Sequence, residues 1–282
     1  MKNLVILAFT FLIVSPSYGD QTVIENYTKA RDTYFYDELY KDGGRTLYCN
    51  TRFKTRGDRF SVEHVYPASW MKETADCPDE TRDGCRKNSR RFNLMEADLH
   101  NLFPALRGIN GDRSNYTFSI IGEDMNEAAY GNCDFEVDAK ERRVEPRPGA
   151  RGEIARAIFY MHSEYGSPID HELFELLVKW HWDDEVSAEE VRRNEVIFKI
   201  QGTRNSFIDN PESVTALGPH EGASDEQWEE CRIKGNISAK GRIYHLPGTR
   251  YYAQTVIDPD KGERWFCSED EAKQAGWRRA NP

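Results

Sequence analysis

Two adjacent residues, Glu63 and His64, form the most suggestive pair of reactive side chains in the sequence. A histidine titrates near neutral pH and can take a proton from water, whereas a carboxylate is an oxygen ligand for a hard divalent cation. Neighbouring residues on a strand point to opposite faces, so both can serve one site only where the strand ends or bends. Tyr66-Pro67 supplies such an end. An isolated Glu-His pair is most often a surface or capping pair, so further residues are needed to assign a site.

Side chains that could complete a hydrolytic site occur in two later segments, Met95 to Leu102 and Ile109 to Asn115. Hydrolysis of a phosphodiester needs a base for water and positive charge near the phosphate and the departing oxygen. Asn110 carries an amide oxygen of the kind that hard cations accept. We expect Pro104 to start a short helix over Ala105 to Asn110, close to a strand over Arg59 to His64. The simpler alternatives are a turn at Asn110-Gly111 and a core hydrogen bond for His100.

The first nineteen residues have the features of a secretory signal peptide. Lys2 precedes an apolar run from Leu4 to Val14, which is too short to span a bilayer. Ser17-Tyr18-Gly19 places small residues where a signal peptidase cuts, so we expect the mature chain to begin at Asp20. A buried N-terminal helix or an uncleaved anchor is the alternative. The pattern predicts a periplasmic or secreted protein whose mature part does not enter a membrane.

Six cysteines agree with export, because disulfides persist in oxidising compartments. Six cysteines allow 15 pairings, and the sequence alone does not fix one. Proximity favours Cys77–Cys85, a shared C-terminal segment favours Cys231–Cys267, and Cys49–Cys133 is then left. Zinc binding is the weaker interpretation, since no CxxC spacing occurs.

The formal charge of −10 is unusual for a protein that handles a polyanion, but it is unevenly distributed. Residues 45–115 contain 13 basic and 10 acidic residues, whereas residues 116–230 contain 11 basic and 26 acidic ones. We therefore expect an acidic solvated face away from any anionic substrate. The segment from Lys72 to Arg91 is polar and patternless, which predicts a surface loop. The basic residues of this segment could contact successive phosphates of a nucleic-acid backbone. These residues are Arg82, Arg86, Lys87, Arg90 and Arg91.

Periodicity predicts a mainly helical domain. Helices are expected over Ile24 to Tyr40, Gly152 to Tyr165, His171 to Trp182, and from the capping box Ser187-Ala-Glu-Glu190 to Ile200. A strand is also predicted over Arg45 to Cys49. Residues 212–230 are expected to form a linker, since Pro, Gly, Ser and acidic residues dominate there without a period. Residues 231–282, with aromatic strand-like runs and turn signals, are expected to form a small β-rich module.

Five segments in order resemble the endonuclease I family, a group of periplasmic or secreted bacterial nucleases. The segments are Glu63-His64-Val-Tyr-Pro67, Met95-Glu96-Ala-Asp-Leu-His-Asn-Leu102, Asn110-Gly-Asp-Arg-Ser-Asn115, Arg151-Gly-Glu-Ile-Ala-Arg-Ala157 with Phe159-Tyr-Met161, and Gln201-Gly-Thr-Arg-Asn205 with Phe207-Ile-Asp209. The resemblance spans about residues 30–211 and implies an α+β fold, in which a mainly helical domain contains a ββα-metal nuclease core. The expected division is 1–19 signal peptide, 20–211 nuclease domain, 212–230 linker and 231–282 module.

The resemblance also implies roles for individual residues. Glu63 and Asn110 would hold Mg²⁺, with Mn²⁺ or Ca²⁺ as substitutes, and His64 would be the general base. A loop arginine would contact phosphate, with Arg86 the first choice and Arg82 the second, because the loop before Glu96 is shorter than in the family. Glu96 is expected to support catalysis near the metal or Arg113, and Asp209 to be structural. The remaining substrate contacts are assigned to Arg82, Lys87, Arg90 and Arg113.

The expected activity is hydrolysis of DNA, and of RNA, with little sequence preference, by a monomer. Contacts to phosphate and sugar carry no base information, which suits cleavage of this kind. Two alternatives stay open. One is a catalytically silent nucleic-acid-binding protein on the same fold, and the other is a metal-independent ribonuclease, whose chemistry needs the 2′-hydroxyl. The C-terminal module could bind nucleic acid or an envelope polymer, or act as a stabilising cap.

Overall fold

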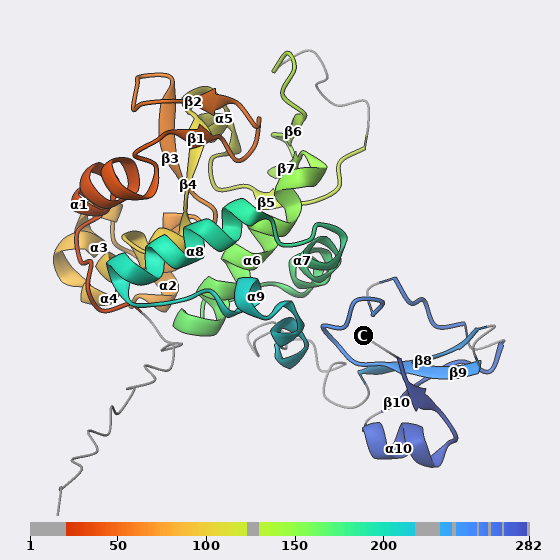
Figure 1. The fold of residues 1–282 in the computed structure, drawn as a ribbon. Helices are drawn as coiled ribbons and strands as arrows, with labels where there is room; N and C mark the ends of the chain where they lie inside the picture. Colours follow the sequence, from red (N-terminus) through yellow and green to blue (C-terminus); the bar gives the residue numbers. More distant parts are fainter. Residues whose placement is uncertain are drawn as a thin grey trace, which may run out of the picture.

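The computed structural model describes residues 21–122, 130–217, 232–238, 241–252, 254–258, 261–266 and 268–280. The predicted signal peptide and the proposed Cys231–Cys267 pair lie outside these residues. Residues 21–217, called the main domain below, combine helices with three small sheets, and residues 232–280, called the C-terminal module, contain a fourth sheet. Figure 1 shows the module in blue beside the end of the main domain. The chain is therefore a mixed α/β protein in which helices predominate in the main domain.

A two-stranded antiparallel sheet carries the first suggestive residues. Strand β3 (Phe60–His64) pairs with β4 (Leu102–Leu106), and helix α5 (Arg107–Arg113) follows β4 directly. The prediction that Pro104 starts a helix was wrong, because Pro104 lies within β4 opposite Val62. Its missing N–H is not needed there, while its carbonyl oxygen accepts a hydrogen bond from the Leu47 N–H at 2.8 Å. The helix therefore begins two residues later than expected and ends at Arg113.

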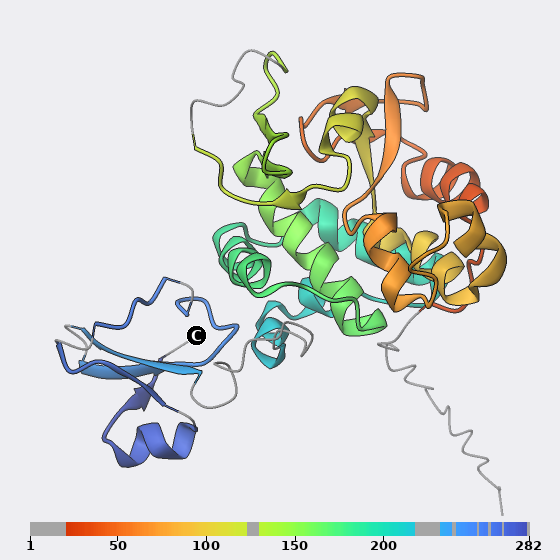
Figure 2. The same ribbon diagram turned by 180° about the vertical axis from the view of Figure 1, so that it is seen from behind.

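Three long helices form the scaffold of the main domain, as predicted. They are α6 (Pro148–Tyr165), α7 (His171–Asp183) and α8 (Ala188–Gln201). Gly166 and Gly202 end α6 and α8 with positive φ, a conformation that glycine adopts at no steric cost. The capping box of Ser187 and Glu190 opens α8. Figure 2 shows α6 running through the middle of the main domain, and its buried residues supply much of the core.

The N-terminal helix is present but has unusual hydrogen bonding. A short α1 (Tyr27–Lys29) runs into the π-helix η1 (Ala30–Leu39), and the Tyr40 N–H donates to the Phe35 carbonyl at 3.0 Å. After it, β1 (Gly44–Arg45) pairs with β2 (Arg52–Phe53). The predicted strand over Arg45 to Cys49 was mostly wrong, because the chain turns at Thr46, whose carbonyl accepts from the Asn50 N–H at 2.9 Å.

The cysteine-bearing segment is helical, so the predicted loop from Lys72 to Arg91 was wrong. It contains α2 (Ala68–Thr74), α3 (Arg82–Asn88) and α4 (Arg90–Glu96). The side chains of Thr81 and Ser89 cap α3 and α4, and these two caps were signals that the sequence offered. The Cys77–Cys85 disulfide is present here, and Cys49 is bonded to Cys133.

Shorter elements complete the main domain. They are η2 (Leu99–Asn101), the sheet of β5 (Thr117–Phe118), β7 (Arg143–Pro146) and β6 (Phe135–Asp138), helix α9 (Ser206–Asp209) and the 3₁₀-helix η3 (Pro211–Ala216). Val214 of η3 is buried in the core. The first residues of the predicted linker are thus packed against the main domain. Among the described residues, no helix is long and apolar enough to cross a membrane.

The C-terminal module is rich in β-structure, as expected. Its sheet has the order β10–β8–β9–β11, made of β8 (Ile233–Ser238), β9 (Gly241–His245), β10 (Arg264–Phe266) and β11 (Arg278–Arg279). Helix α10 (Glu269–Gln274) packs against β10 and β8. Phe266 and Trp277 lie at the centre of its small core. A core of this size provides little stabilisation, which is why contacts with the main domain matter for the module.

Candidate active site

An open cavity of about 640 Å³ brings together residues from four separate segments. Glu63 and His64 come from the end of β3, Asn110 from α5, and Arg82 from the start of α3. Glu63 and Asn110 therefore border the same space although they lie 47 positions apart in the chain. Tyr27, at the start of α1, also lines it.

Glu63 is a buried carboxylate that lines the cavity. Only 2% of the residue is exposed, and its Oε1 accepts a hydrogen bond from the Tyr48 hydroxyl at 2.7 Å. The same oxygen lies 3.2 Å from Arg113 Nε. Burial raises the pKa of Glu63 to about 7, although Arg113 and Tyr48 oppose the shift. Among the described residues Oε2 has no hydrogen-bond partner, so it is available to a cation.

His64 is held as a neutral imidazole with a defined tautomer. Its Nε2 lies 2.9 Å from the Glu96 carbonyl oxygen, and because a carbonyl can only accept, Nε2 carries the proton. Nδ1 then carries the lone pair. Burial, with a further contribution from the Arg82 charge, lowers the pKa of His64 to about 4. At neutral pH the ring is therefore unprotonated, which is the form that a general base requires.

Asn110 is oriented by its amide nitrogen. Nδ2 donates to Ser61 Oγ at 2.9 Å and to the Val62 carbonyl at 3.2 Å, both on strand β3. These bonds fix which end of the amide is the oxygen, and Oδ1 makes no hydrogen bond within the described part of the chain. An amide oxygen and a carboxylate oxygen at one cavity are the donors preferred by Mg²⁺, Mn²⁺ and Ca²⁺.

The donor set fits a cation that keeps much of its water. The described residues contain no cluster of three or more His, Cys, Asp or Glu side chains that could form a closed metal cage. Two protein oxygens at an open cavity leave room for water and phosphate oxygens, which is how Mg²⁺ is usually bound. The residues present therefore suit a hard, partly hydrated cation better than zinc.

Glu96 pairs with two arginines, Arg82 and Arg86. Its oxygens accept from Arg82 Nε at 2.5 Å and from Arg86 Nε and Nη2, both at 2.8 Å. The expectation that Glu96 supports Arg113 was wrong, since Arg113 contacts Glu63. Arg82 lines the cavity and 46% of its side chain is exposed, whereas Arg86 is not among the lining residues. The geometry therefore favours Arg82, the second choice from the sequence, as the arginine nearest a bound phosphate.

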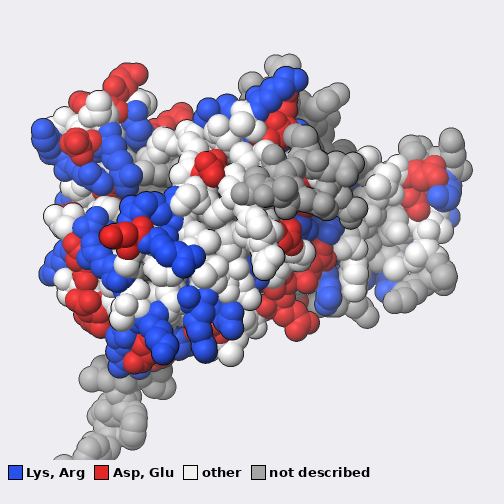
Figure 3. Space-filling model, turned by 90° about the horizontal axis from the view of Figure 1, so that it is seen from above, with Lys and Arg blue, Asp and Glu red and all other residues white. Residues whose placement is uncertain are grey.

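The other predicted substrate contacts separate into buried and surface residues. Arg113 is fully buried and donates through Nη2 to the Val65 carbonyl at 2.7 Å, so it cannot touch substrate and that assignment was wrong. Arg90 is exposed and pairs with Glu25 at 2.6 Å, and Lys87 is an exposed residue of α3. Neither of these two lines the cavity. Figure 3, which views the molecule from above, shows many Lys and Arg side chains on the side that lies away from the C-terminal module.

Two tyrosines of the site were missed from the sequence. The Tyr27 ring lies 5.0 Å from the His64 ring, and the guanidinium groups of Arg82 and Arg86 lie 5.4 and 5.7 Å from its centroid. Tyr27 thus packs against both the histidine and two positive charges. Tyr48 holds Glu63 from its buried side. Both tyrosines come from N-terminal segments with no motif of their own, so no local signal marked them.

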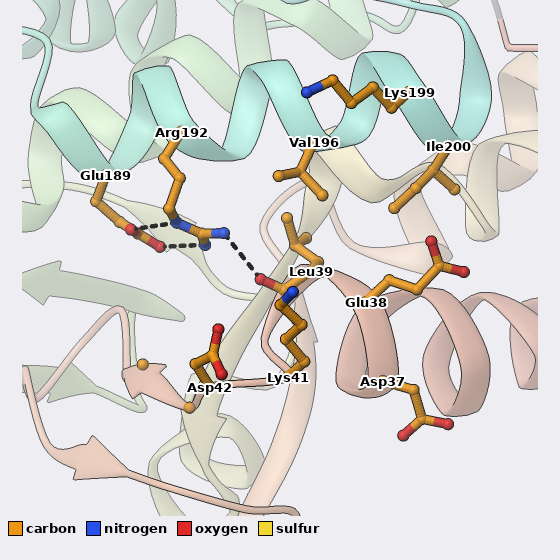
Figure 4. A pocket seen from close by; sticks show the side chains of 12 residues that line it. Asp37, Glu38, Leu39, Lys41, Asp42, Glu189, Arg192, Val196, Lys199 and Ile200 are labelled. Carbon is orange, nitrogen blue, oxygen red and sulfur yellow. Dashed lines mark hydrogen bonds and ion pairs between the residues drawn. The ribbon is translucent and has the colours of Figure 1, made fainter.

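A second cavity, of about 420 Å³, lies between η1 and α8 and contains none of the predicted site residues. Figure 4 shows Leu39, Val196 and Ile200 among charged side chains there, with Arg192 turned toward Glu189. Arg192 Nη2 lies 2.7 Å from Glu189 Oε1, and Nη1 donates to the Leu39 carbonyl at 3.0 Å. This guanidinium is already satisfied by the protein, so it is not available to an anionic substrate.

Sequence comparisons show the family to which this chain is similar. The profile of the endonuclease I family matches residues 16–212. An extracellular deoxyribonuclease of Aeromonas hydrophila is 34% identical over 233 residues, covering 74% of this chain and 97% of the relative. A periplasmic deoxyribonuclease of the same species is 37% identical over 197 residues, covering 61% of this chain and 81% of the relative. An extracellular ribonuclease of Bacillus subtilis is 33% identical over 140 residues, covering 43% of this chain and 46% of the relative.

These matches place the chain among the nucleases. More particularly, it belongs to the endonuclease I family. The matched residues end within η3, so the C-terminal module lies outside the family profile.

Proposed function

We propose that this protein is a secreted or periplasmic endonuclease that hydrolyses phosphodiester bonds of DNA, and of RNA, with one divalent cation and a histidine base. The observation that carries the proposal is the shared cavity of Glu63, His64, Asn110 and Arg82. Strands β3 and β4 with helix α5 would be the ββα-metal core of the family. The names of the relatives, which include deoxyribonucleases and a ribonuclease, support both substrate classes.

His64 would take the proton from the attacking water. Its Nε2–H is bound to the Glu96 carbonyl, so Nδ1 is the nitrogen with a free lone pair. The lowered pKa keeps the imidazole neutral across the neutral pH range. The Glu96 carbonyl also fixes the ring plane, so the base is oriented before substrate arrives.

Glu63 and Asn110 would hold the cation through Oε2 and Oδ1. When bound, Mg²⁺ would supply positive charge to the phosphate and neutralise the departing 3′ oxygen. Mn²⁺ or Ca²⁺ could occupy the same oxygens. Arg113 and Tyr48 keep the Glu63 carboxylate in place from its buried side.

Arg82 would bind the phosphate that is cleaved, and Glu96 would hold that guanidinium at the rim of the cavity. Arg86 shares Glu96 and would tune the position of its neighbour. Guanidinium contacts to phosphate carry no base information, which supports cleavage with little sequence preference. The predicted signal peptide and the extracellular or periplasmic names of the relatives support export. We propose that the enzyme acts as a monomer.

The test is an assay of the mature chain on circular DNA and on RNA, each with Mg²⁺ and with a chelator. The proposal predicts that both substrates are cut with Mg²⁺, and that cleavage stops in chelator and in His64→Ala. Lys273→Ala, on the exposed surface of α10, is the matched control and should cut normally. Binding of DNA without cleavage would instead identify a silent binding protein. Chelator-resistant cleavage confined to RNA would identify a metal-independent ribonuclease.

A further inference from the structure

A cavity of about 510 Å³ lies between the C-terminal module and η3 of the main domain. The main domain contributes Glu212 and Thr215, and the module contributes the rest, including Arg250, Tyr251 and Arg279. The two parts touch closely here, because the Trp182 indole N–H donates to the Gly248 carbonyl at 3.2 Å. A Cβ on Gly248 would lie 2.6 Å from the Val214 carbonyl oxygen, so the interface has no space for a larger residue.

The arginines of this cavity differ from most arginines of the main domain. Arg82, Arg86 and Arg90 each pair with a carboxylate. Arg250 and Arg279 are exposed, and neither takes part in an ion pair within the described ranges. Unpaired guanidinium groups at the rim of a cavity are suited to bind an anion, and their planar geometry matches phosphate and carboxylate groups.

An aromatic ring lies beside these cations. Tyr251 is 45% exposed, and the Arg250 guanidinium lies 5.8 Å from its ring centroid. An exposed ring next to unpaired cations is the combination that binds single-stranded nucleic acids, because bases stack on the ring while cations follow the backbone. Duplex bases already stack on one another and present no free face to a ring at a cavity rim.

We propose that this cavity is a second nucleic-acid site, specific for single strands and separate from the active site. Tyr251 would stack on one base, and Arg250 and Arg279 would each bind a phosphate. Glu212 on the opposite wall repels phosphate, so the backbone would lie on the side of the module. The inference rests on the proposed nuclease function, since it takes nucleic acid as the polyanion that the protein meets.

The site would increase the residence of the enzyme on a single-stranded region without entering the chemistry. The C-terminal segment contains 10 basic and 6 acidic residues between positions 231 and 282, although the chain as a whole is acidic. Binding should therefore be sensitive to salt. For a single strand, each phosphate that the protein neutralises adds about 0.7 to the steepness with which log K falls against log salt.

The experiment measures the fluorescence anisotropy of a labelled oligothymidylate with the full mature chain in chelator. Tyr251→Ala is expected to weaken binding about 5-fold or more, since the stacking of one base is removed. The double variant Arg250→Ala/Arg279→Ala should also lower the steepness of the salt dependence by about 1.4, because two phosphates are no longer neutralised. Lys273→Ala removes one positive charge from the same module outside the cavity and serves as the control, with little change expected.

Three results would overturn the inference. They are unchanged affinity in both cavity variants, an equal weakening in Lys273→Ala, and a stronger effect of the cavity variants on an acidic polysaccharide than on the oligonucleotide. The assay needs no cleavage, so it is independent of the proposed activity. If wild-type protein binds the oligonucleotide through Tyr251 but never cuts DNA or RNA, the enzymatic proposal fails and the second site stands.

Discussion

Two regions of the main domain each place a carboxylate beside a histidine, and they are built alike. His64 follows Glu63 at the end of β3, and His100, within η2, comes two residues after Asp98, which caps η2. Both imidazoles are buried, each Nε2 contacts a backbone carbonyl, and burial lowers the pKa of His64 to about 4 and of His100 to about 3. Burial and a shifted pKa therefore do not tell the two apart.

The two carboxylates differ in whether one of their oxygens remains without a hydrogen-bond partner. Asp98 accepts hydrogen bonds from the hydroxyls of Tyr160 and Tyr165 and from the Gln201 amide, in the closed core. Glu63 lines the cavity, and its contacts with Tyr48 and Arg113 both fall on Oε1. A saturated carboxylate holds the fold together, whereas one with a free oxygen at a cavity can bind a ligand. Access to the cavity, and not sequence proximity, is the reason for proposing Glu63 and His64 as the reactive pair.

The largest effect is expected when each of the two histidines is substituted separately. His64→Ala is expected to reduce the cleavage rate by about 10²- to 10⁴-fold, because a general base is removed. His100→Gln keeps a hydrogen-bond donor and should leave the rate within about twofold, while costing about 1 kcal/mol of unfolding free energy. Single-turnover cleavage and urea denaturation measure the two quantities. Equal reductions of activity in both variants would show that His64 and His100 do not differ in function.

Removing the arginines that share Glu96 should have the next largest effect. Arg82→Ala is expected to lower the rate by about 10²-fold, the effect of removing one charged donor to the reacting phosphate. Arg86→Ala should have a smaller effect, about tenfold, because Arg86 does not line the cavity. Parallel assays of the two variants on circular DNA rank them. A reversed order would restore Arg86, the first choice from the sequence, as the phosphate ligand.

A smaller effect is expected for Tyr27, which acts through its neighbours. Tyr27→Leu removes the ring that packs on His64 and lies under Arg82, so the rate should fall about tenfold. Tyr27→Phe keeps the ring and should be close to wild type. The maximal rate should change more than KM, because the residue positions the base instead of holding substrate. Loss of activity in Tyr27→Phe would point to a direct role of the hydroxyl.

The smallest effect is on stability and concerns His100 alone. Its pKa falls from 6.5 to about 3 on folding, so below pH 6.5 the unfolded chain binds more protons and stability drops as pH falls. His100→Gln removes this contribution, so its deficit of about 1 kcal/mol relative to wild type should shrink below pH 6.5, by at most about 1.4 kcal/mol per pH unit, and should reverse in sign by pH 5. Urea denaturation at pH 7, 6 and 5 measures the gap. A constant gap would show that His100 is not buried as a neutral ring.

The sequence predicted best those features that depend on local spacing. The helices over 148–201 have their own caps and stops, and strand β3 has its own alternation. Features set by distant contacts were missed. Pro104 was predicted to start a helix because its pairing with Val62 depends on a segment distant in sequence. Arg113 was predicted to contact substrate because no neighbouring residue in the sequence indicates that it is buried. Glu63, His64 and Asn110 could be proposed as site residues because they lie in segments that resemble family motifs.

The most direct test of the central claim is calorimetric titration of Mn²⁺ into the mature protein without nucleic acid. Convergence of Glu63 Oε2 and Asn110 Oδ1 predicts one ion per chain, with binding weakened at least about tenfold in Asn110→Ala and retained in His64→Ala. Absence of binding, or binding that Asn110→Ala leaves unchanged, would contradict the assignment of these two oxygens as the cation site.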